Sequence, residues 1–230
     1  MHLIVFDVDG TLTDTNAMDA EWQAAREVLR LPPTHSRWLD EVEHYTDLGI
    51  ASQHCKAAFG RNMMASEIDL FKRRIVAHLD AALLANAECI RAMPGAADVL
   101  AAIRSRSDLC AAIATGCFLP SAEFKLRKAG LFDGSISMVG CDDAPSREAI
   151  MLSAARKAAA KHGCQFSAVT YVGDGVWDVR AARNLGWGFI GIGSGDAAVQ
   201  LRQAGAAKVV PDFKPAIRFL DLLGEIPNRG

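Results

Sequence analysis

Asp7 and Asp9 stand one residue apart near the start of the chain, directly after a run of four apolar residues, Leu3–Phe6. The run is rich in β-branched and aromatic residues, which predicts a buried strand, and Gly10 then allows the backbone to turn. Two carboxylates this close repel one another and favour a nearby cation. The segment therefore predicts a metal-assisted reaction at the carboxyl end of a buried strand.

Further polar residues follow two later strands and open one later helix. They are Thr115 and Gly116 after Cys110–Ala114, Asp174 and Asp178 after Ala168–Val172, and Arg147 after its expected N-cap Ser146. In open α/β sheets, ligands bind outside the carboxyl ends of the strands. We therefore expect these side chains and the first two aspartates to face one crevice.

The elements that must position these residues change in character along the chain. From Pro94 onward, short apolar runs alternate with helical patterns, which predicts a parallel sheet with right-handed connections. The predicted strands after the first are 110–114, 136–139, 168–172, 189–192 and 208–210. Between the first strand and Pro94 the pattern is helical, without a convincing strand. We predict an α/β fold with a Rossmann-like parallel-sheet core, residues 1–14 and 93–230, and an inserted all-helical domain, residues 15–92.

Composition narrows the classes of partner. The chain has 230 residues, of which 50% are hydrophobic, and its formal net charge is -2. A chain without a basic stripe predicts no nucleic-acid partner, and apolar runs this short predict no membrane span. The six cysteines show no C-x-x-C spacing, which is typical of reduced thiols in a cytoplasmic protein.

Taken together, these segments resemble the haloacid dehalogenase-like hydrolase superfamily, in its phosphatase type with a helical cap after the first motif. Asp7–Thr11 is similar to the first family motif, Ala112–Gly116 to the second and Gly173–Asp178 to the fourth, with Arg147 in the place of the third. The resemblance covers essentially the whole chain and extends to phosphoglycolate phosphatases and β-phosphoglucomutases. It implies that the inserted helices form a cap that closes over the crevice, with hinges near 13–15 and 93–95.

The resemblance also implies a role for each polar residue in phosphoryl transfer. Asp7 would be the nucleophile that forms an aspartyl-phosphate, and Asp9 would be the general acid and base, for which a raised pKa is expected. The implied phosphate-binding groups are the Thr115 hydroxyl, the Gly116 N–H and Arg147. The implied ligands of a Mg²⁺ cofactor are Asp7, the backbone carbonyl of Asp9, Asp174 and, directly or through water, Asp178.

Two features of this chain are not fixed by the family pattern. The third motif more often carries lysine, so Lys125 and Lys128 are alternatives to Arg147. Within the cap, Thr46–Ile50 interrupts the helical periodicity, which predicts a loop that reaches the active site. The substrate contacts expected from that loop are Thr46, Asp47 and Gly49.

The implied function is a Mg²⁺-dependent phosphatase that hydrolyses a small phosphorylated metabolite as a monomer or homodimer. β-Phosphoglucomutase-like phosphoryl transfer would use the same core residues, so the products must separate the two. Phosphonatase-like C–P hydrolysis would need a cap lysine that forms a Schiff base, and Lys56 is the candidate. The non-enzyme alternatives are a phospho-receiver, which would be shorter and lack a cap, and a phosphate-binding protein without catalysis.

Overall fold

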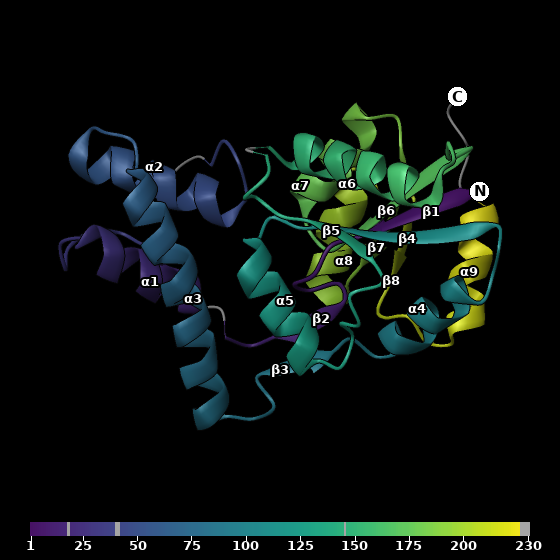
Figure 1. The fold of residues 1–230 in the computed structure, drawn as a ribbon, viewed down its shortest axis with the longest axis horizontal. Helices are drawn as coiled ribbons and strands as arrows, with labels where there is room; N and C mark the ends of the chain where they lie inside the picture. The colour runs from purple at the N-terminus through teal and green to yellow at the C-terminus, as the bar shows by residue number, and fades with distance from the viewer. Residues whose placement is uncertain (18, 40–41, 145, 226–230) are drawn as a thin grey trace.

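The computed structural model describes residues 1–17, 19–39, 42–144 and 146–225. Its core is a six-stranded sheet in the order β5-β4-β1-β6-β7-β8, and every pairing in it is parallel (Figure 1). The strands are β1 (His2–Phe6), β4 (Leu109–Ala114), β5 (Ser137–Val139), β6 (Ala168–Gly173), β7 (Gly188–Ile192) and β8 (Lys208–Val210). The core helices are α4 (Ala96–Arg104), α5 (Leu119–Lys128), α6 (Arg147–His162), α7 (Val176–Asn184), α8 (Gly195–Gln203) and α9 (Ala216–Gly224). The predicted α/β class is confirmed.

The register of the central strands brings the polar residues together. Phe6 at the end of β1 pairs with Ile113 of β4 on one side and with Val172 of β6 on the other. Because the three strands are parallel and end almost level, the residues that follow them emerge at the same edge of the sheet. This edge carries the site described below.

Both faces of the sheet are covered by helices, which explains why its strands are apolar almost throughout. On β1, Leu3 and Val5 belong to the core cluster that includes α6 and α7, whereas Ile4 and Phe6 belong to the cluster that includes α4, α5 and α9. The alternation follows from the opposite directions of successive side chains along a strand. The helix α6 begins as predicted, since the Ser146 hydroxyl accepts a hydrogen bond from the N–H of Ala149 at 3.3 Å.

The inserted segment forms a helical cap beside the core (Figure 1). Its helices are α1 (Ala20–Leu29), α2 (Asp47–Phe59) and α3 (Ala65–Ala85). Phe71, Ile75 and Leu79 recur along one face of α3 and are buried with Ala20 and Ala24 of α1. Burial of this apolar face stabilises the pair of helices, because most helical stability in proteins comes from packing of an apolar face.

A two-stranded ribbon joins the cap to the core. Its strands, β2 (Thr13–Thr15) and β3 (Ile90–Ala92), pair antiparallel. The expectation that no strand lies between the first strand and Pro94 is therefore wrong, because strands of only three residues are too short to show a periodicity of their own. The ribbon coincides with the first expected hinge. The domain boundaries remain predictions. Residues 145 and 226–230 of the predicted core, and residues 18 and 40–41 of the predicted cap, lie outside the described residues.

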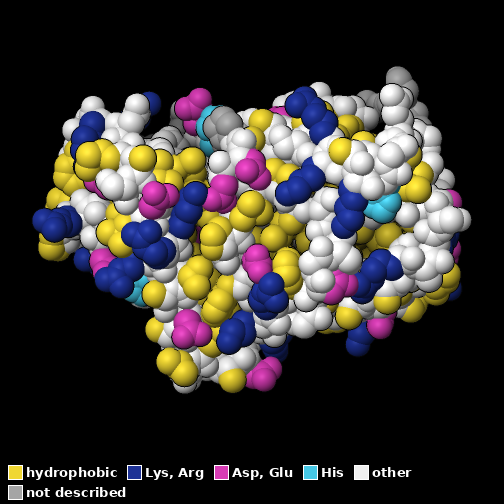
Figure 2. Space-filling view, in the orientation of Figure 1, with side chains coloured by type: hydrophobic (Ala, Val, Ile, Leu, Met, Phe, Trp, Pro, Cys, Tyr) yellow, Lys and Arg dark blue, Asp and Glu magenta, His cyan; other side chains and the backbone are white. Residues whose placement is uncertain are grey.

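The structure also shows the state of the cysteines, the character of the helices and the distribution of surface charge. All six cysteines are free thiols, five of them buried. Among the described helices, none combines the length and apolar character that a membrane crossing requires. Positive and negative side chains alternate over the face shown in Figure 2, where neither sign dominates a continuous patch.

Candidate active site

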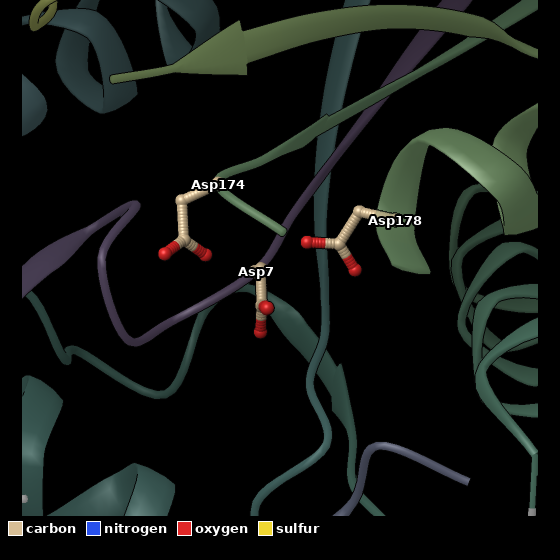
Figure 3. Close-up of side chains that lie close together, drawn as sticks. All are labelled: Asp7, Asp174 and Asp178. Carbon is tan, nitrogen blue, oxygen red and sulfur yellow. The ribbon is translucent and has the colours of Figure 1, made fainter. Parts of the chain in front are cut away.

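Three carboxylates meet at the carboxyl edge of the sheet and lie around a common space (Figure 3). Asp7 follows β1 directly, Asp174 follows β6, and Asp178 lies in the first turn of α7. Each of them offers an oxygen within 4.8 Å of an oxygen of the other two. The fold therefore brings together three of the four aspartates that the sequence suggested as metal ligands.

Burial and mutual repulsion disfavour the ionised form of these three aspartates. Burial raises the pKa of Asp7, and it raises the pKa of Asp178 to about 7. Burial, followed by the charges of Asp178 and Asp7, raises the pKa of Asp174 well above its ordinary value. Asp178 Oδ1 is moreover buried without a hydrogen bond. Clustered carboxylate oxygens of this kind are the ligands that Mg²⁺ prefers, so the donor set fits a divalent cation.

Gly10 makes the close approach of Asp174 possible. Its φ is +67°, and a Cβ atom at this position would lie 2.1 Å from Asp174 Oδ2. Any side chain would thus strain the backbone and displace a carboxylate of the cluster. This explains why a glycine directly follows the two aspartates of the first motif.

Arg147 is the cation next to the three aspartates. Its buried guanidinium donates through Nη1 to Asp7 Oδ2 at 3.2 Å, and its Nε lies 3.3 Å from Asp178 Oδ1. The buried Thr115 hydroxyl also hydrogen-bonds Asp7, and a Cβ atom on Gly116 would lie 2.9 Å from Arg147 Nη2. All three residues expected to bind phosphate therefore surround Asp7.

Asp9 is half-buried beside this group and pairs with a different cation. Lys125 Nζ donates to Asp9 Oδ2 at 2.6 Å, and the Cys117 thiol donates to the same oxygen at 3.0 Å. Burial favours the neutral carboxyl, but attraction to Lys125 and the bond from Cys117 outweigh it and lower the pKa of Asp9. The expected raised pKa is thus wrong for the protein without substrate, because it took no account of Lys125.

Lys125 also connects the core to the cap. Its side chain is 1% exposed, and its ammonium group donates to Glu21 of α1 at 3.1 Å. Lys128, the other alternative to Arg147, is exposed. A signal for Lys125 is present in the sequence, because it shares the apolar stripe of α5 with Ala122 and Leu126, and a buried lysine needs a buried partner.

The expected loop at Thr46–Ile50 is instead the beginning of α2. Thr46 is the N-cap, and its hydroxyl accepts from the N–H of Gly49 at 3.0 Å. A polar capping residue followed by a glycine is also typical of a loop, so the sequence pattern predicted a loop where a helix begins. Gly49 packs against the backbone instead of facing the site, since a Cβ atom there would lie 2.3 Å from the carbonyl oxygen of His44.

Asp47 nevertheless reaches the site, as expected. Its N–H donates to the carbonyl of Gly116 at 2.9 Å, and its Oδ2 accepts from the N–H of Phe118 at 3.1 Å. Burial and then the charge of Glu21 raise the pKa of Asp47 to about 8. The first turn of α2 is thus bonded directly to the loop that follows β4.

Tyr45 and Trp177 are site residues that sequence reasoning missed. Their rings stack with centroids 4.5 Å apart and an interplanar angle of 9°, which joins the segment before α2 to the first turn of α7. The carbonyl of Tyr45 also accepts from Arg147 Nη2 at 3.1 Å. Trp177 lies inside the fourth motif, so its position there was the available signal.

A cavity of about 550 Å³ lies between the cap and the sheet edge. Asp7, Asp9, Thr115, Gly116, Arg147 and Asp174 line one end of it, together with Thr46 and Asp47 from the cap. Lys56, the residue on which a Schiff-base mechanism would depend, is exposed and does not line this cavity. The arrangement offers a nucleophilic carboxylate, anion-binding donors and a cation site at the end of an open volume.

Comparison with known proteins identifies similar chains. A family model described as haloacid dehalogenase-like hydrolase matches residues 1–186. A phosphoglycolate phosphatase from Synechococcus elongatus is 30% identical over 201 residues, which cover 82% of this chain and 85% of that protein.

Solved structures share the fold over nearly the full length. A hydrolase from Pseudomonas syringae superimposes with a TM-score of 0.72 at 23% identity, and the match covers 97% of this chain and 99% of that one. A putative β-phosphoglucomutase from Thermotoga maritima gives a TM-score of 0.55 at 24% identity, covering 98% and 99% of the two chains.

Proposed function

This chain belongs to the haloacid dehalogenase-like hydrolase family, and we propose that it is a Mg²⁺-dependent phosphatase that acts through an aspartyl-phosphate. The observation that carries the proposal is the place of Asp7, between buried Arg147 and two further carboxylates at one end of a cavity. The substrate in this proposal is a small phosphorylated metabolite. The cytoplasmic location and the monomeric or homodimeric state remain predictions.

In the first step, a carboxylate oxygen of Asp7 forms a bond to phosphorus while the bond between phosphorus and the leaving oxygen breaks. Arg147, the Thr115 hydroxyl and the Gly116 N–H would donate to the other phosphoryl oxygens. Asp9 gives a proton to the leaving oxygen. The negative charge of a bound phosphoryl group opposes the effect of Lys125 and favours the protonated form of Asp9.

In the second step, Asp9 takes a proton from a water molecule, whose oxygen forms a new bond to phosphorus. The bond between phosphorus and Asp7 breaks, which releases inorganic phosphate and restores the free carboxylate. The ion pair with Lys125 supports this step, because it favours the ionised form of Asp9 that accepts the proton. One residue thus acts as acid and then as base.

The residues that would hold Mg²⁺ are Asp7, Asp174, Asp178 and the backbone carbonyl of Asp9. The fit rests on three carboxylates whose pKa values are raised by burial and on the buried, unbonded Oδ1 of Asp178. When bound, Mg²⁺ supplies positive charge that stabilises the phosphoryl group during its transfer. Arg147 alone leaves this cluster with more negative than positive charge.

Hydrolysis is favoured over phosphoryl shift by the curated relative, which is a phosphatase. The likeness to a putative β-phosphoglucomutase concerns the fold, so a mutase reaction remains the alternative. Phosphonatase-like cleavage has less support because Lys56 lies outside the cavity lining.

The experiment that tests the proposal measures free phosphate released from a panel of phosphomonoesters, with Mg²⁺ and with EDTA. We expect release that is lost in EDTA and restored by excess Mg²⁺. Chromatography of the products separates the alternatives, since a mutase would return a phosphorylated isomer and little free phosphate. A panel without Mg²⁺-dependent release would contradict the proposal.

A further inference from the structure

The cavity at the active site is larger and more apolar than the phosphoryl chemistry requires. Its volume of about 550 Å³ is within the range of pockets that enclose drug-sized ligands, roughly 300–1,000 Å³. Away from the three aspartates, its walls are formed by aromatic and aliphatic side chains from three segments. Trp22 of α1 and Ile50 of α2 are partly exposed there, and the buried side chains of Ala25, Ala51, His54 and Phe71 lie behind them.

Trp22 and His54 form a tilted aromatic pair at the apolar end, with an interplanar angle of 51°. Their ring centroids are 5.0 Å apart, and His54 Nδ1 lies 3.1 Å from His35 Nε2. Burial, followed by the neighbouring His35, lowers the pKa of His54 to about 4, so its ring is uncharged at neutral pH. An uncharged imidazole beside an indole favours contact with another ring and offers no charge to an anion.

The charged side chains that line the rest of the cavity do not favour a second anionic group on the substrate. Three of them, Asp14, Glu21 and Asp47, are acidic. Among the described lining residues the arginines are Arg37 and Arg147, and both are engaged in ion pairs, with Asp19 and with Asp7 respectively. Asp14 and Glu21 are paired in turn with Arg91 and Lys125, and the raised pKa of Asp47 favours its neutral form. A carboxylate or second phosphate in the leaving group would therefore find its possible cation partners in the described lining already paired.

The cavity retains this size while the cap is in contact with the core. Tyr45 stacks on Trp177, and Asp47 is hydrogen-bonded to the loop after β4. On the other side, Lys125 of the core pairs with Glu21 of the cap. The volume thus lies between two bodies that already touch at both margins, although it is partly open to solvent, and it is not the gap of a detached cap.

We propose that the leaving group of the substrate is an uncharged, ring-sized apolar alcohol whose ring lies against Trp22, with the buried ring of His54 behind it. The inference rests on the proposed phosphatase function and specifies its substrate class. It sets this chain apart from its curated relative, whose name states the small, anionic substrate phosphoglycolate. Burial of the ring against aromatic and aliphatic side chains provides the binding free energy, and a lining whose arginines are already paired gives anionic competitors little compensating attraction.

The test compares kcat/KM for benzyl phosphate, ethyl phosphate and 2-phosphoglycolate in Mg²⁺. All three release an alcohol whose oxygen is bonded to a CH₂ group, so differences report recognition of the leaving group more than its intrinsic reactivity. We expect benzyl phosphate to exceed each of the others by on the order of tenfold or more, mainly through KM. Equal or better use of 2-phosphoglycolate would overturn the proposal.

Two variants and a matched control locate the effect in the cavity. Ile50→Lys places a cation in the lining at a residue that is 36% exposed, so the fold tolerates it. It is expected to raise KM for benzyl phosphate and lower KM for 2-phosphoglycolate. Trp22→Ala should raise KM for benzyl phosphate and leave KM for ethyl phosphate nearly unchanged. The control is Phe59→Ala, at a residue on the same helix as Ile50 that is 43% exposed and outside the lining. It should change KM for neither benzyl phosphate nor ethyl phosphate.

The outcomes separate this proposal from the one on which it rests. If no phosphomonoester in the wider panel releases phosphate with Mg²⁺, the phosphatase function itself is wrong. If phosphate is released but benzyl phosphate has no advantage and Ile50→Lys leaves the preference unchanged, only the substrate class is wrong.

Discussion

Lys125 and Arg147 are two buried cations that pair with different carboxylates. Arg147 lies against Asp7 and Asp178, whereas Lys125 pairs with Asp9 and, across the junction, with Glu21. The planar guanidinium reaches two carboxylates and the carbonyl of Tyr45 at once, a geometry that a single ammonium group does not reproduce. We therefore propose that Arg147 fills the role of the third motif and that Lys125 positions Asp9.

Replacing Arg147 tests this assignment. Arg147→Ala removes the donor next to Asp7, so kcat/KM should fall by roughly 10²–10³, as when one donor to a developing negative charge is lost. Arg147→Lys should restore part of the activity, because the charge returns without the planar geometry. The measurement is phosphate release with Mg²⁺. Near-normal activity in Arg147→Ala would show that the assignment is wrong.

Replacing Lys125 should reduce stability far more than replacing its neighbour on the same helix. Lys125→Met leaves Asp9 and Glu21 without their shared cation; because both carboxylates stay about a third exposed, the loss should cost about 1–3 kcal/mol. Lys128→Met, at an exposed position, should change the free energy of unfolding by no more than about 0.5 kcal/mol. Urea denaturation measures both. Similar values for the two variants would be inconsistent with the Lys125 network.

At the residue scale, the acidic residues that follow the strands could be predicted from the sequence, whereas the cations that pair with them could not. Asp7, Asp9 and Asp174 follow apolar runs whose ends must meet at one sheet edge, so type and spacing were sufficient to group them. The pairing of Asp9 with Lys125 joins residues 116 positions apart and depends on which face of α5 is buried. Its effect on the pKa of Asp9 followed only from the structure.

The cap helices illustrate what periodicity can and cannot predict. The long apolar stripe of α3, which buries Phe71, Ile75 and Leu79, was visible in the sequence. The start of α2 was not, because Thr46 and Gly49 resemble a loop although the first caps the helix. The strands β2 and β3 were also missed, since each has three residues and is stabilised by pairing with the other.

The packing of α1 on α2 should make cap stability sensitive to pH through His54. The pKa of His54 is lowered to about 4 in the folded protein, chiefly by burial, against about 6.5 when unfolded. The unfolded chain therefore binds the proton more readily, and this contribution to stability falls as pH drops from about 6.5 toward 4. Well above pH 6.5 both states are neutral and the contribution is constant.

The measurement is the free energy of unfolding at pH 7 and pH 5 for the wild type and for His54→Gln. Removing the titrating ring should make the decrease between the two pH values smaller in the variant. Subtracting the pH dependence of the variant from that of the wild type isolates the contribution of His54. The aspartates of the active site contribute equally to both proteins, and their raised pKa values make stability rise as pH falls. Identical pH dependence in the two proteins would contradict the interpretation.

For the molecule as a whole, the alternation of strands and helices predicted the core and the insertion of a helical cap. The cavity between them was not predictable, because its walls combine Trp22, Tyr45, His54 and Trp177, which come from separate elements. Taken singly, the sequence around each of these residues is typical of an ordinary aromatic side chain in the core or on the surface. The reaction class therefore follows from four short motifs, whereas the substrate class depends on how the cap rests on the core.

The most direct measurement of the central claim is Mg²⁺-dependent phosphate release by Asp7→Asn. The substitution keeps the shape of the side chain but removes the nucleophile, so turnover of the best substrate in the panel should fall at least about a thousandfold. Circular dichroism and thermal unfolding should remain close to the wild type, because the neutral amide relieves repulsion among the three buried aspartates. A folded Asp7→Asn protein that still releases phosphate at a rate near that of the wild type would contradict the aspartyl-phosphate mechanism.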